Sequence, residues 1–182
     1  MGLPSRYPCR SSADRRAILL VCTANICRSP MAEVVLRKRL SSAGLDFDID
    51  SAATHEYMIG MPPYTLAVAT AKARGYDITG ILARRVRLHD FKFFDLILGM
   101  SRANIDWLKA FSPARHRRKI RLLTEYSAGF RREDVPDPYG GGVAGYELAL
   151  DIIEDACEGV VRSFGVPGRS SSSAIAARDA VA

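Results

Sequence analysis

Short apolar runs that alternate with helical stripes are the feature that most constrains how this chain can fold. A short continuous apolar run is typical of a strand that is buried on both faces of a parallel sheet. Apolar residues that recur roughly every three or four positions are typical of an amphipathic helix. Chains in which the two patterns alternate form a parallel sheet with helices on both faces. The sequence therefore predicts an α/β fold.

The predicted elements follow one another along most of the chain. Strands are expected over Ile18–Cys22, Phe47–Ala53, Asp95–Met100 and Ile120–Leu123. Helices are expected over Pro30–Leu40, Tyr64–Arg74, Arg102–Phe111 and Tyr146–Phe164. Ser101 should cap the third helix, and Gly44 should end the first. A loop rich in glycine and proline, residues 135–142, precedes the last helix.

The two ends of the chain lack this pattern. We expect a flexible arm over residues 1–16, a single folded domain over residues 17–164 and a flexible tail over residues 165–182. A length of 182 residues suits one domain. The apolar run at residues 17–22 is too short to cross a membrane, and no small-residue cleavage site follows it. We therefore expect a soluble, cytoplasmic protein with no membrane insertion.

The net charge of +6 is unevenly distributed. Residues 84–132 hold 13 Lys and Arg against 4 Asp and Glu, whereas residues 133–164 hold 1 basic residue and 8 acidic ones. A tract such as Arg115–Lys119 is found in nucleic-acid binders, but also in solvated helix ends and loops. Because the neighbouring stretch is so acidic, we favour the solvated segment and expect no nucleic-acid partner.

The four cysteines give no sign of a metal site. Cys9, Cys22, Cys27 and Cys157 form no pair of Cys-x-x-Cys motifs, and the three histidines lie at no metal-ligand spacing. We therefore expect free thiols, no metal and no other cofactor. Cys157 lies among apolar residues of the last predicted helix, so we expect it in the core.

The end of the first predicted strand carries the candidate site, since ligands of such sheets bind at the carboxyl ends of the strands. There, Cys22 is followed by five residues and Arg28. A loop of this length can curl its N–H groups around a tetrahedral oxyanion, and the following helix adds its positive end. The guanidinium of Arg28 matches two phosphate oxygens. The same surroundings favour the thiolate of Cys22, a nucleophile beside a bound phosphorus.

The spacing alone is weak evidence, because Cys9 and Arg15 share it. That pair follows no strand and opens no helix, so we assign the phosphate loop to Cys22 and Arg28. A thiolate nucleophile also needs an acid that protonates the leaving group. Asp137, between two prolines, is the best candidate, although it also fits an ordinary turn aspartate.

Several segments resemble the low-molecular-weight protein tyrosine phosphatase family. Val21–Glu33 is similar to the phosphate-loop signature of that family, and Pro136–Tyr139 is similar to its acid loop. Asp50–Ala53 and Phe94–Met100 resemble its second and third strands. The resemblance covers residues 17–164 and implies a four-stranded parallel sheet with helices on both faces.

The resemblance also implies catalytic roles. Cys22 would be the nucleophile, Arg28 would clamp the phosphate and the transition state, and Asp137 would act first as general acid and then as general base. Ser29 would donate its hydroxyl to the Cys22 thiolate.

Asn25 would take a strained loop conformation that Ser51 ties down. Asparagine tolerates left-handed backbone geometry better than most residues, which independently favours that role.

Four further residues have implied roles near the phosphate loop. Tyr139 and Tyr57 would form the walls of the slot for the substrate ring, although Tyr57 equally fits an exposed loop aromatic. Ile26 would favour an aryl phosphate. Cys27 would form a reversible disulfide with Cys22 under oxidants, but it also fits a small buried loop residue.

Two positions depart from the family pattern. Residues 80–84 lack the histidine often found shortly before the Ala-Arg pair, and Ser101 replaces an aspartate. Neither change touches the chemistry, so they put local structure rather than activity in doubt.

The expected activity is metal-free hydrolysis of phosphotyrosine in protein substrates, through a phosphocysteine. Arsenate reductases on this scaffold need two further downstream cysteines, and residues 29–156 contain none. Protein-arginine phosphatases have a threonine in the place of Ile26. A non-catalytic phosphate-binding module would keep Arg28 but has no use for Cys22 or Asp137. The last two remain alternatives to the phosphotyrosine phosphatase, and the sequence does not predict the oligomeric state.

Overall fold

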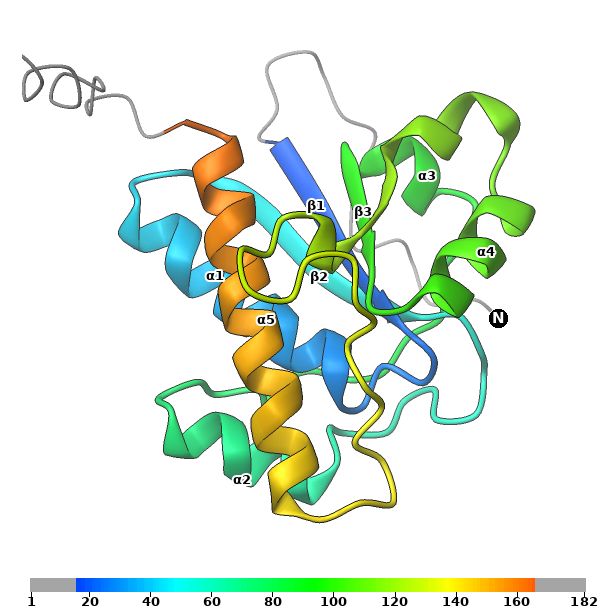
Figure 1. Ribbon diagram of the computed structural model, residues 1–182. Helices are drawn as coiled ribbons and strands as arrows, with labels where there is room; N and C mark the ends of the chain where they lie inside the picture. Colours follow the sequence, from blue (N-terminus) through cyan, green and yellow to red (C-terminus); the bar gives the residue numbers. More distant parts are fainter. Residues whose placement is uncertain (1–15, 166–182) are drawn as a thin grey trace, which may run out of the picture.

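A four-stranded parallel sheet forms the centre of the structure (Figure 1). Its strands pair in the order β2-β1-β3-β4, and every neighbouring pair is parallel. The strands are β1 (Arg16–Cys22), β2 (Phe47–Ala53), β3 (Leu96–Gly99) and β4 (Ile120–Leu122). The α/β fold with a four-stranded parallel sheet is therefore confirmed.

The computed structural model describes residues 16–165. Cys9 and nearly all of the expected arm and tail lie outside the described residues.

Five α-helices and two short 3₁₀ helices complete the described part of the chain. The α-helices are α1 (Arg28–Ser42), α2 (Thr65–Ala73), α3 (Asp90–Phe93), α4 (Arg102–Phe111) and α5 (Val143–Ser163). The 3₁₀ helices are η1 (Ala114–Lys119) and η2 (Leu123–Glu125). None of the helices between residues 16 and 165 combines the length and hydropathy that a membrane-spanning helix needs.

The central strand β1 divides the core into two layers because its side chains alternate between the two faces of the sheet. Ile18 and Leu20 pack in the layer with buried residues of α1, α2 and α5. Leu19 and Val21 pack in the other layer, with the phenylalanines of α3 and the apolar face of α4. All of these β1 side chains are fully buried. The site at the end of β1 therefore stands on a strand that is held from both sides.

The predicted element boundaries differ from the observed ones mainly at helix starts. α1 begins at Arg28, inside the phosphate loop, and α5 begins at Val143 rather than Tyr146. The first turn of α5 is largely exposed, so it carries no apolar stripe; Tyr146 is its first buried residue. The predicted cap is confirmed: the hydroxyl of Ser101 accepts a hydrogen bond from the backbone N–H of Asn104 at 3.3 Å.

The basic tract Arg115–Lys119 forms most of the 3₁₀ helix η1, which has no buried residue. The expected solvated segment is thus present, in 3₁₀ form rather than as a helix end and loop. Cys157 is fully buried on α5, which confirms its expected place in the core. On the same helix, a Cβ at Gly159 would lie 1.7 Å from the carbonyl oxygen of Tyr126, so only glycine allows this close approach.

Asp155 of α5 holds the loop that follows η2. One carboxylate oxygen, Oδ2, accepts hydrogen bonds from the Ser127 hydroxyl and from the backbone N–H groups of Ala128 and Gly129, the last two at 3.0 Å. The hydrogen bond from Ser127 is the main reason why the pKa of Asp155 lies below its ordinary value. A lowered carboxyl pKa stabilises the fold above the pKa of the unfolded chain, and this stabilisation is lost as pH falls through the folded pKa.

We predict that Asp155→Asn lowers the free energy of unfolding by about 1–2 kcal/mol at pH 7, because the amide makes weaker bonds to the three donors. The difference from wild type should shrink as pH falls below about 4, where the wild-type carboxylate becomes protonated. Urea unfolding of both proteins at several pH values measures this. An equal difference at every pH would contradict the assignment.

Candidate active site

The phosphate loop joins the end of β1 to the start of α1, at the carboxyl edge of the sheet. The side chain of Cys22 is buried, and its Sγ accepts a hydrogen bond from the backbone N–H of Asn25 at 3.3 Å. The hydroxyl oxygen of Ser29, in the first turn of α1, lies 3.1 Å from the same sulfur. A backbone N–H group and a hydroxyl group therefore converge on the sulfur of Cys22.

Asn25 has a φ of 57°, a left-handed conformation that asparagine tolerates better than most residues. Its side chain is fully buried. The amide nitrogen donates to the hydroxyl oxygens of Ser29 at 2.9 Å and of Ser51 at 2.8 Å. The amide oxygen accepts the backbone N–H of Arg84 at 3.0 Å. Asn25 thus joins the phosphate loop to β2 and to the segment that carries Arg84.

The Arg28 guanidinium lies beside the carboxylate of Asp137. Nη2 of Arg28 is 2.5 Å from Oδ2 of Asp137, and it also donates to the Thr23 hydroxyl at 3.3 Å. Nη1 donates to the carbonyl of Val135 at 3.2 Å. Nε is buried and has no hydrogen-bond partner among the described residues. A buried donor without a partner is unfavourable, and an oxyanion in the loop would supply one.

A cavity of about 180 Å³ opens at this loop. It is lined by Cys22, Thr23, Ala24, Ile26, Cys27, Arg28, Tyr57, Met58, Asp137 and Tyr139. The thiol, guanidinium and carboxyl groups singled out in the sequence thus face one space. Asn25, Ser29 and Ser51 do not line the cavity and are buried.

Two tyrosines stand at the mouth of the cavity. Tyr57 is 72% exposed and Tyr139 is 54% exposed. Tyr57 stacks on the ring of His55, with centroids 5.2 Å apart, and Tyr139 meets the edge of Tyr64 at the same distance. Tyr57 is therefore an exposed loop aromatic that also lines the cavity, and its contact with a substrate ring stays a prediction.

Cys27 is buried in the loop, and its sulfur lies 3.7 Å from the Tyr146 hydroxyl. Burial raises the pKa of Cys27 to about 12, so this thiol is protonated at neutral pH. Cys22, Cys27 and Cys157 are all free thiols. Between residues 16 and 165, no group of three or more His, Cys, Asp or Glu side chains is arranged to hold a metal ion.

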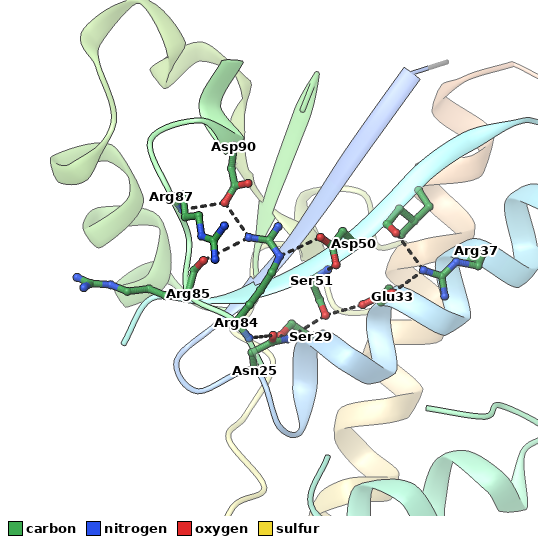
Figure 2. A network of polar contacts seen from close by, with 11 residues as sticks. Asn25, Ser29, Glu33, Arg37, Asp50, Ser51, Arg84, Arg85, Arg87 and Asp90 are labelled. Carbon is green, nitrogen blue, oxygen red and sulfur yellow. Dashed lines mark hydrogen bonds and ion pairs between the residues drawn. The ribbon is translucent and has the colours of Figure 1, made fainter. Parts of the chain in front are cut away.

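A network of polar side chains supports the loop from behind (Figure 2). Its members come from the phosphate loop, α1, β2, the segment before α3 and α3 itself. The Arg84 guanidinium bonds the carboxylates of Asp50 and Asp90, each at 2.9 Å. The Ser51 hydroxyl donates to the carboxylate of Glu33 at 2.5 Å. Figure 2 shows these links running continuously from Asp90 to Arg37.

Sequence reasoning did not single out part of this arrangement. Thr23, Ala24 and Met58 line the cavity, and their nearness in sequence to Cys22 and Tyr57 was the available signal. Glu33 and Arg84 lie in the supporting network. The backbone N–H of Arg84 anchors the Asn25 amide, and a pattern of side chains in the sequence does not reveal the role of a backbone group.

Comparison with known proteins gives one consistent result. Residues 17–166 match the profile of the family described as low molecular weight phosphotyrosine protein phosphatase. A low molecular weight phosphotyrosine protein phosphatase of Schizosaccharomyces pombe is 39% identical, over 81% of this chain and 96% of its own. A low molecular weight protein-tyrosine-phosphatase of Streptomyces coelicolor is 38% identical, over 85% of this chain and 98% of its own.

Solved structures agree with these matches. The crystal structure of a protein tyrosine phosphatase from Entamoeba histolytica superposes with a TM-score of 0.79 and 35% identity, covering 82% of this chain and 96% of that one. The family profile spans all of the sheet except Arg16, together with both loops of the site. The two relatives are 38–39% identical over most of both chains. The chain therefore belongs to the low molecular weight phosphotyrosine protein phosphatase family.

Proposed function

We propose that this protein hydrolyses phosphotyrosine monoesters in protein substrates, with Cys22 as nucleophile, Arg28 as phosphate clamp and Asp137 as general acid and base. The observation that carries the proposal is the single cavity that the Cys22 thiol, the Arg28 guanidinium and the Asp137 carboxyl group line together. Family membership agrees with this activity.

The substrate phosphate would enter beside the ion pair of Arg28 and Asp137. Arg28 has its Nε free for an oxyanion, and its Nη2 is held by Asp137 until phosphate competes for it. Once the phosphate takes the guanidinium, Asp137 loses its cationic partner and gains an anionic neighbour. The Asp137 carboxyl group is thereby released from the guanidinium and can serve as the general acid of the first step.

The first chemical step transfers the phosphoryl group to sulfur. The Cys22 thiolate attacks phosphorus, so an S–P bond forms while the P–O bond to the tyrosine oxygen breaks. Asp137 gives its proton to the departing phenolate, and the products are a phosphocysteine and a neutral phenol. Arg28 and the loop N–H groups stabilise the charge on the equatorial oxygens.

The second step releases inorganic phosphate. Water attacks the phosphocysteine, and the ionised Asp137 takes its proton. The S–P bond breaks, and its electron pair returns to Cys22 as thiolate. The hydrogen bonds to Sγ from the Asn25 backbone and from Ser29 favour that thiolate as leaving group.

The shape of the cavity favours an aromatic substrate. Ile26 is a buried apolar residue in its wall, and Tyr57 and Tyr139 flank its mouth. Such walls pack on a phenyl ring but gain little from a serine methylene. Phosphoarginine remains the alternative substrate. The cytoplasmic location and the disulfide between Cys22 and Cys27 stay predictions from the sequence.

We predict that Cys22→Ser loses phosphatase turnover by more than about 10³-fold, because a serine hydroxyl is not ionised at neutral pH. Hydrolysis of an aryl phosphate should persist in EDTA for the wild type. Cys157→Ser, whose sulfur lies in the core, is the matched control and should keep its turnover. Undiminished turnover of Cys22→Ser, or full inhibition by the chelator, would refute the mechanism.

We predict that Asp137→Asn slows phosphotyrosine cleavage by roughly 10²–10⁴-fold, the typical contribution of a general acid. The phenol of tyrosine has a pKa of about 10 and leaves poorly as an anion, whereas nitrophenolate needs less help. The pre-steady-state burst with p-nitrophenyl phosphate should therefore be slowed distinctly less.

The control is Asp134→Asn, an acidic residue of the same segment that pairs with Arg102 at 3.4 Å and does not line the cavity. It should show wild-type bursts with both substrates. If Asp137→Asn slows the two bursts by the same factor, Asp137 is a structural turn residue and the acid lies elsewhere.

We predict that the wild type strongly prefers phosphotyrosine peptides to phosphoserine and phosphoarginine peptides, and that Ile26→Thr weakens this preference by roughly 10-fold. Threonine removes apolar contact with the ring and adds a polar group to the wall. The ratios of kcat/KM for the three peptides measure this. Ile59→Thr, an exposed position outside the cavity lining, should leave the ratios unchanged. Comparable kcat/KM values for all three wild-type reactions would contradict the assignment.

A further inference from the structure

A buried glutamate lies behind the phosphate loop without touching the cavity. Glu33, on α1, is only 4% exposed and is absent from the cavity lining. Its Oε2 accepts the Ser51 hydroxyl, and its Oε1 accepts Nη2 of Arg37, each at 2.5 Å. In Figure 2 the glutamate is the point where the chain of bonds from the phosphate loop meets Arg37. Both carboxylate oxygens therefore act as acceptors.

The direction of the bonds around Asn25 is fixed by a group that can only donate. The backbone N–H of Arg84 faces one end of the Asn25 amide, so that end must be the oxygen. The NH₂ end therefore faces both Ser29 and Ser51, and both hydroxyl oxygens act as its acceptors. Each serine still has one hydrogen to donate.

The two remaining hydrogens have one acceptor each. Ser51 directs its hydrogen to Glu33, and Ser29 directs its hydrogen to the sulfur of Cys22. The ionised carboxylate of Glu33 suits this arrangement, because it offers acceptors on both oxygens, whereas a protonated one would also bring an O–H donor that needs a partner. If Glu33 presented a donor to Ser51, the Ser51 hydrogen would have no acceptor, because the Asn25 oxygen is held by the Arg84 N–H. Ser51 could then be satisfied only by pulling the Asn25 amide away from Arg84, which would also disturb the bond between Asn25 and Ser29.

We propose that Glu33 is a positioning residue, whose ionised carboxylate orients Ser51, Asn25 and Ser29 in turn so that Ser29 donates its hydroxyl to the Cys22 thiolate. The proposal rests on the proposed function of Cys22 as nucleophile. It adds a carboxylate that acts on the reaction through three intervening side chains and touches no substrate.

The energetics of burial separate this role from a structural one. Burial raises the pKa of Glu33 above its ordinary value, against the opposing effects of its bonds to Ser51 and Arg37. The charged groups that act on it are Arg37 on its own helix and Asp50 on β2. A raised carboxyl pKa means that the fold is favoured by protonation and that the ionised form costs stability at neutral pH. A residue kept only for stability would not carry this cost.

The test begins with Glu33→Gln. Arg37 is a charged donor and should hold the only amide oxygen of Gln, which leaves the amide NH₂ facing Ser51. We expect kcat for a phosphotyrosine peptide to fall by roughly 10-fold or more, the effect of losing one hydrogen bond to a charged group. The free energy of unfolding at neutral pH should be unchanged or higher.

A second readout does not depend on phosphatase activity. Iodoacetamide labels the thiolate of Cys22, and fragment-ion mass spectrometry of peptide 17–28 separates this label from Cys27. The pH profile of labelling should shift to higher pH in Glu33→Gln, because the thiolate has lost the Ser29 donor. This shift is expected whatever the substrate proves to be, so it separates failure of this proposal from failure of the proposed function.

A rescue experiment distinguishes orientation from packing. In Glu33→Gln combined with Arg37→Met, no cation competes for the amide oxygen, which becomes free to accept from Ser51. The double variant should recover a large part of kcat and of the labelling profile. Because Glu33→Gln has already neutralised the buried carboxylate, the removal of Arg37 leaves no buried charge unpaired. It also removes the hydrogen bond from Arg37 to the Ile49 carbonyl, so Arg37→Met alone is measured as a further control. A loss that merely reflected packing would grow with the second substitution.

Asp155→Asn is the matched control, since it also neutralises a hydrogen-bonded carboxylate on a helix. Asp155 bonds Ser127 and Ala128 and makes no bond to the network behind the phosphate loop. It should lower stability and leave kcat and labelling unchanged, the opposite of Glu33→Gln. The proposal is overturned if Glu33→Gln keeps wild-type kcat and labelling, if it unfolds or loses stability in proportion to activity, or if the double variant shows no recovery.

A double-mutant cycle with Ser51→Ala tests the same chain from its other end. Within residues 16–165, Ser51 is the only side chain that links Glu33 to Asn25 by hydrogen bonds, so its removal disconnects the carboxylate from the loop. Glu33→Gln should then add no further shift in labelling to Ser51→Ala. Additive shifts would show that Glu33 acts by another route and would refute the proposal.

Discussion

The side-chain amide of Asn25 is the interaction on which the rest of the site depends. A left-handed residue in a tight loop is under strain, and it persists only when its surroundings hold it. Three hydrogen bonds do so here, to Ser29, to Ser51 and from the backbone of Arg84. Because these partners come from α1, β2 and the segment before α3, the loop is closed only when the sheet and its helices are already assembled.

The phosphate loop concentrates hydrogen-bond donors and the positive charge of Arg28. The carboxylate of Asp137 offsets that charge from the edge of the loop. Arg28 brings a positive charge into a buried position, and Asp137 from a distant loop provides the opposite charge at its edge. Asp137 is half-exposed, so its half of the ion pair is readily exchanged for another anion. The same contact therefore neutralises Arg28 and, in the proposed mechanism, holds the acid at the place where a phenolate would leave.

Sequence reasoning reached the fold and the members of the cavity for identifiable reasons. β1 is a continuous apolar run because it is buried on both faces, and the motif from Cys22 to Arg28 is contiguous, so its geometry is local. Asp137 could be found because two prolines mark its loop. The part of the polar network beyond Asn25, Ser29 and Ser51 could not be found in this way. Glu33 has the sequence context of an ordinary residue in an early helical turn, and the link from Arg84 to Asn25 uses a backbone N–H that any residue other than proline would provide.

The departure from the family pattern at residues 80–84 shows the same limit. A missing histidine suggested local disturbance, yet this segment anchors Asn25 through Arg84 and is itself held by two buried carboxylates, Asp50 and Asp90. A sequence comparison shows which side chain is absent. The anchoring of Asn25 depends instead on the position of the backbone N–H of Arg84. The backbone of this segment is held by its hydrogen bonds to Ala53 of β2 and by the ion pairs of the Arg84 guanidinium, none of which involves the missing histidine.

Two hydrogen-bonded carboxylates of this protein have opposite effects on stability at neutral pH. The pKa of Asp155 is lowered, chiefly by the hydrogen bond from Ser127, and its ionised form stabilises the fold at neutral pH. The pKa of Glu33 is raised by burial, and its ionised form opposes the fold under the same conditions. Both carboxylates accept more than one hydrogen bond, so a count of bonds alone would predict that both stabilise the fold. What differs is the balance with desolvation: Asp155 lies on α5 and is partly exposed, whereas Glu33 is buried behind the phosphate loop. The role proposed there for Glu33 as a fixed acceptor is one that the free energy of folding does not measure.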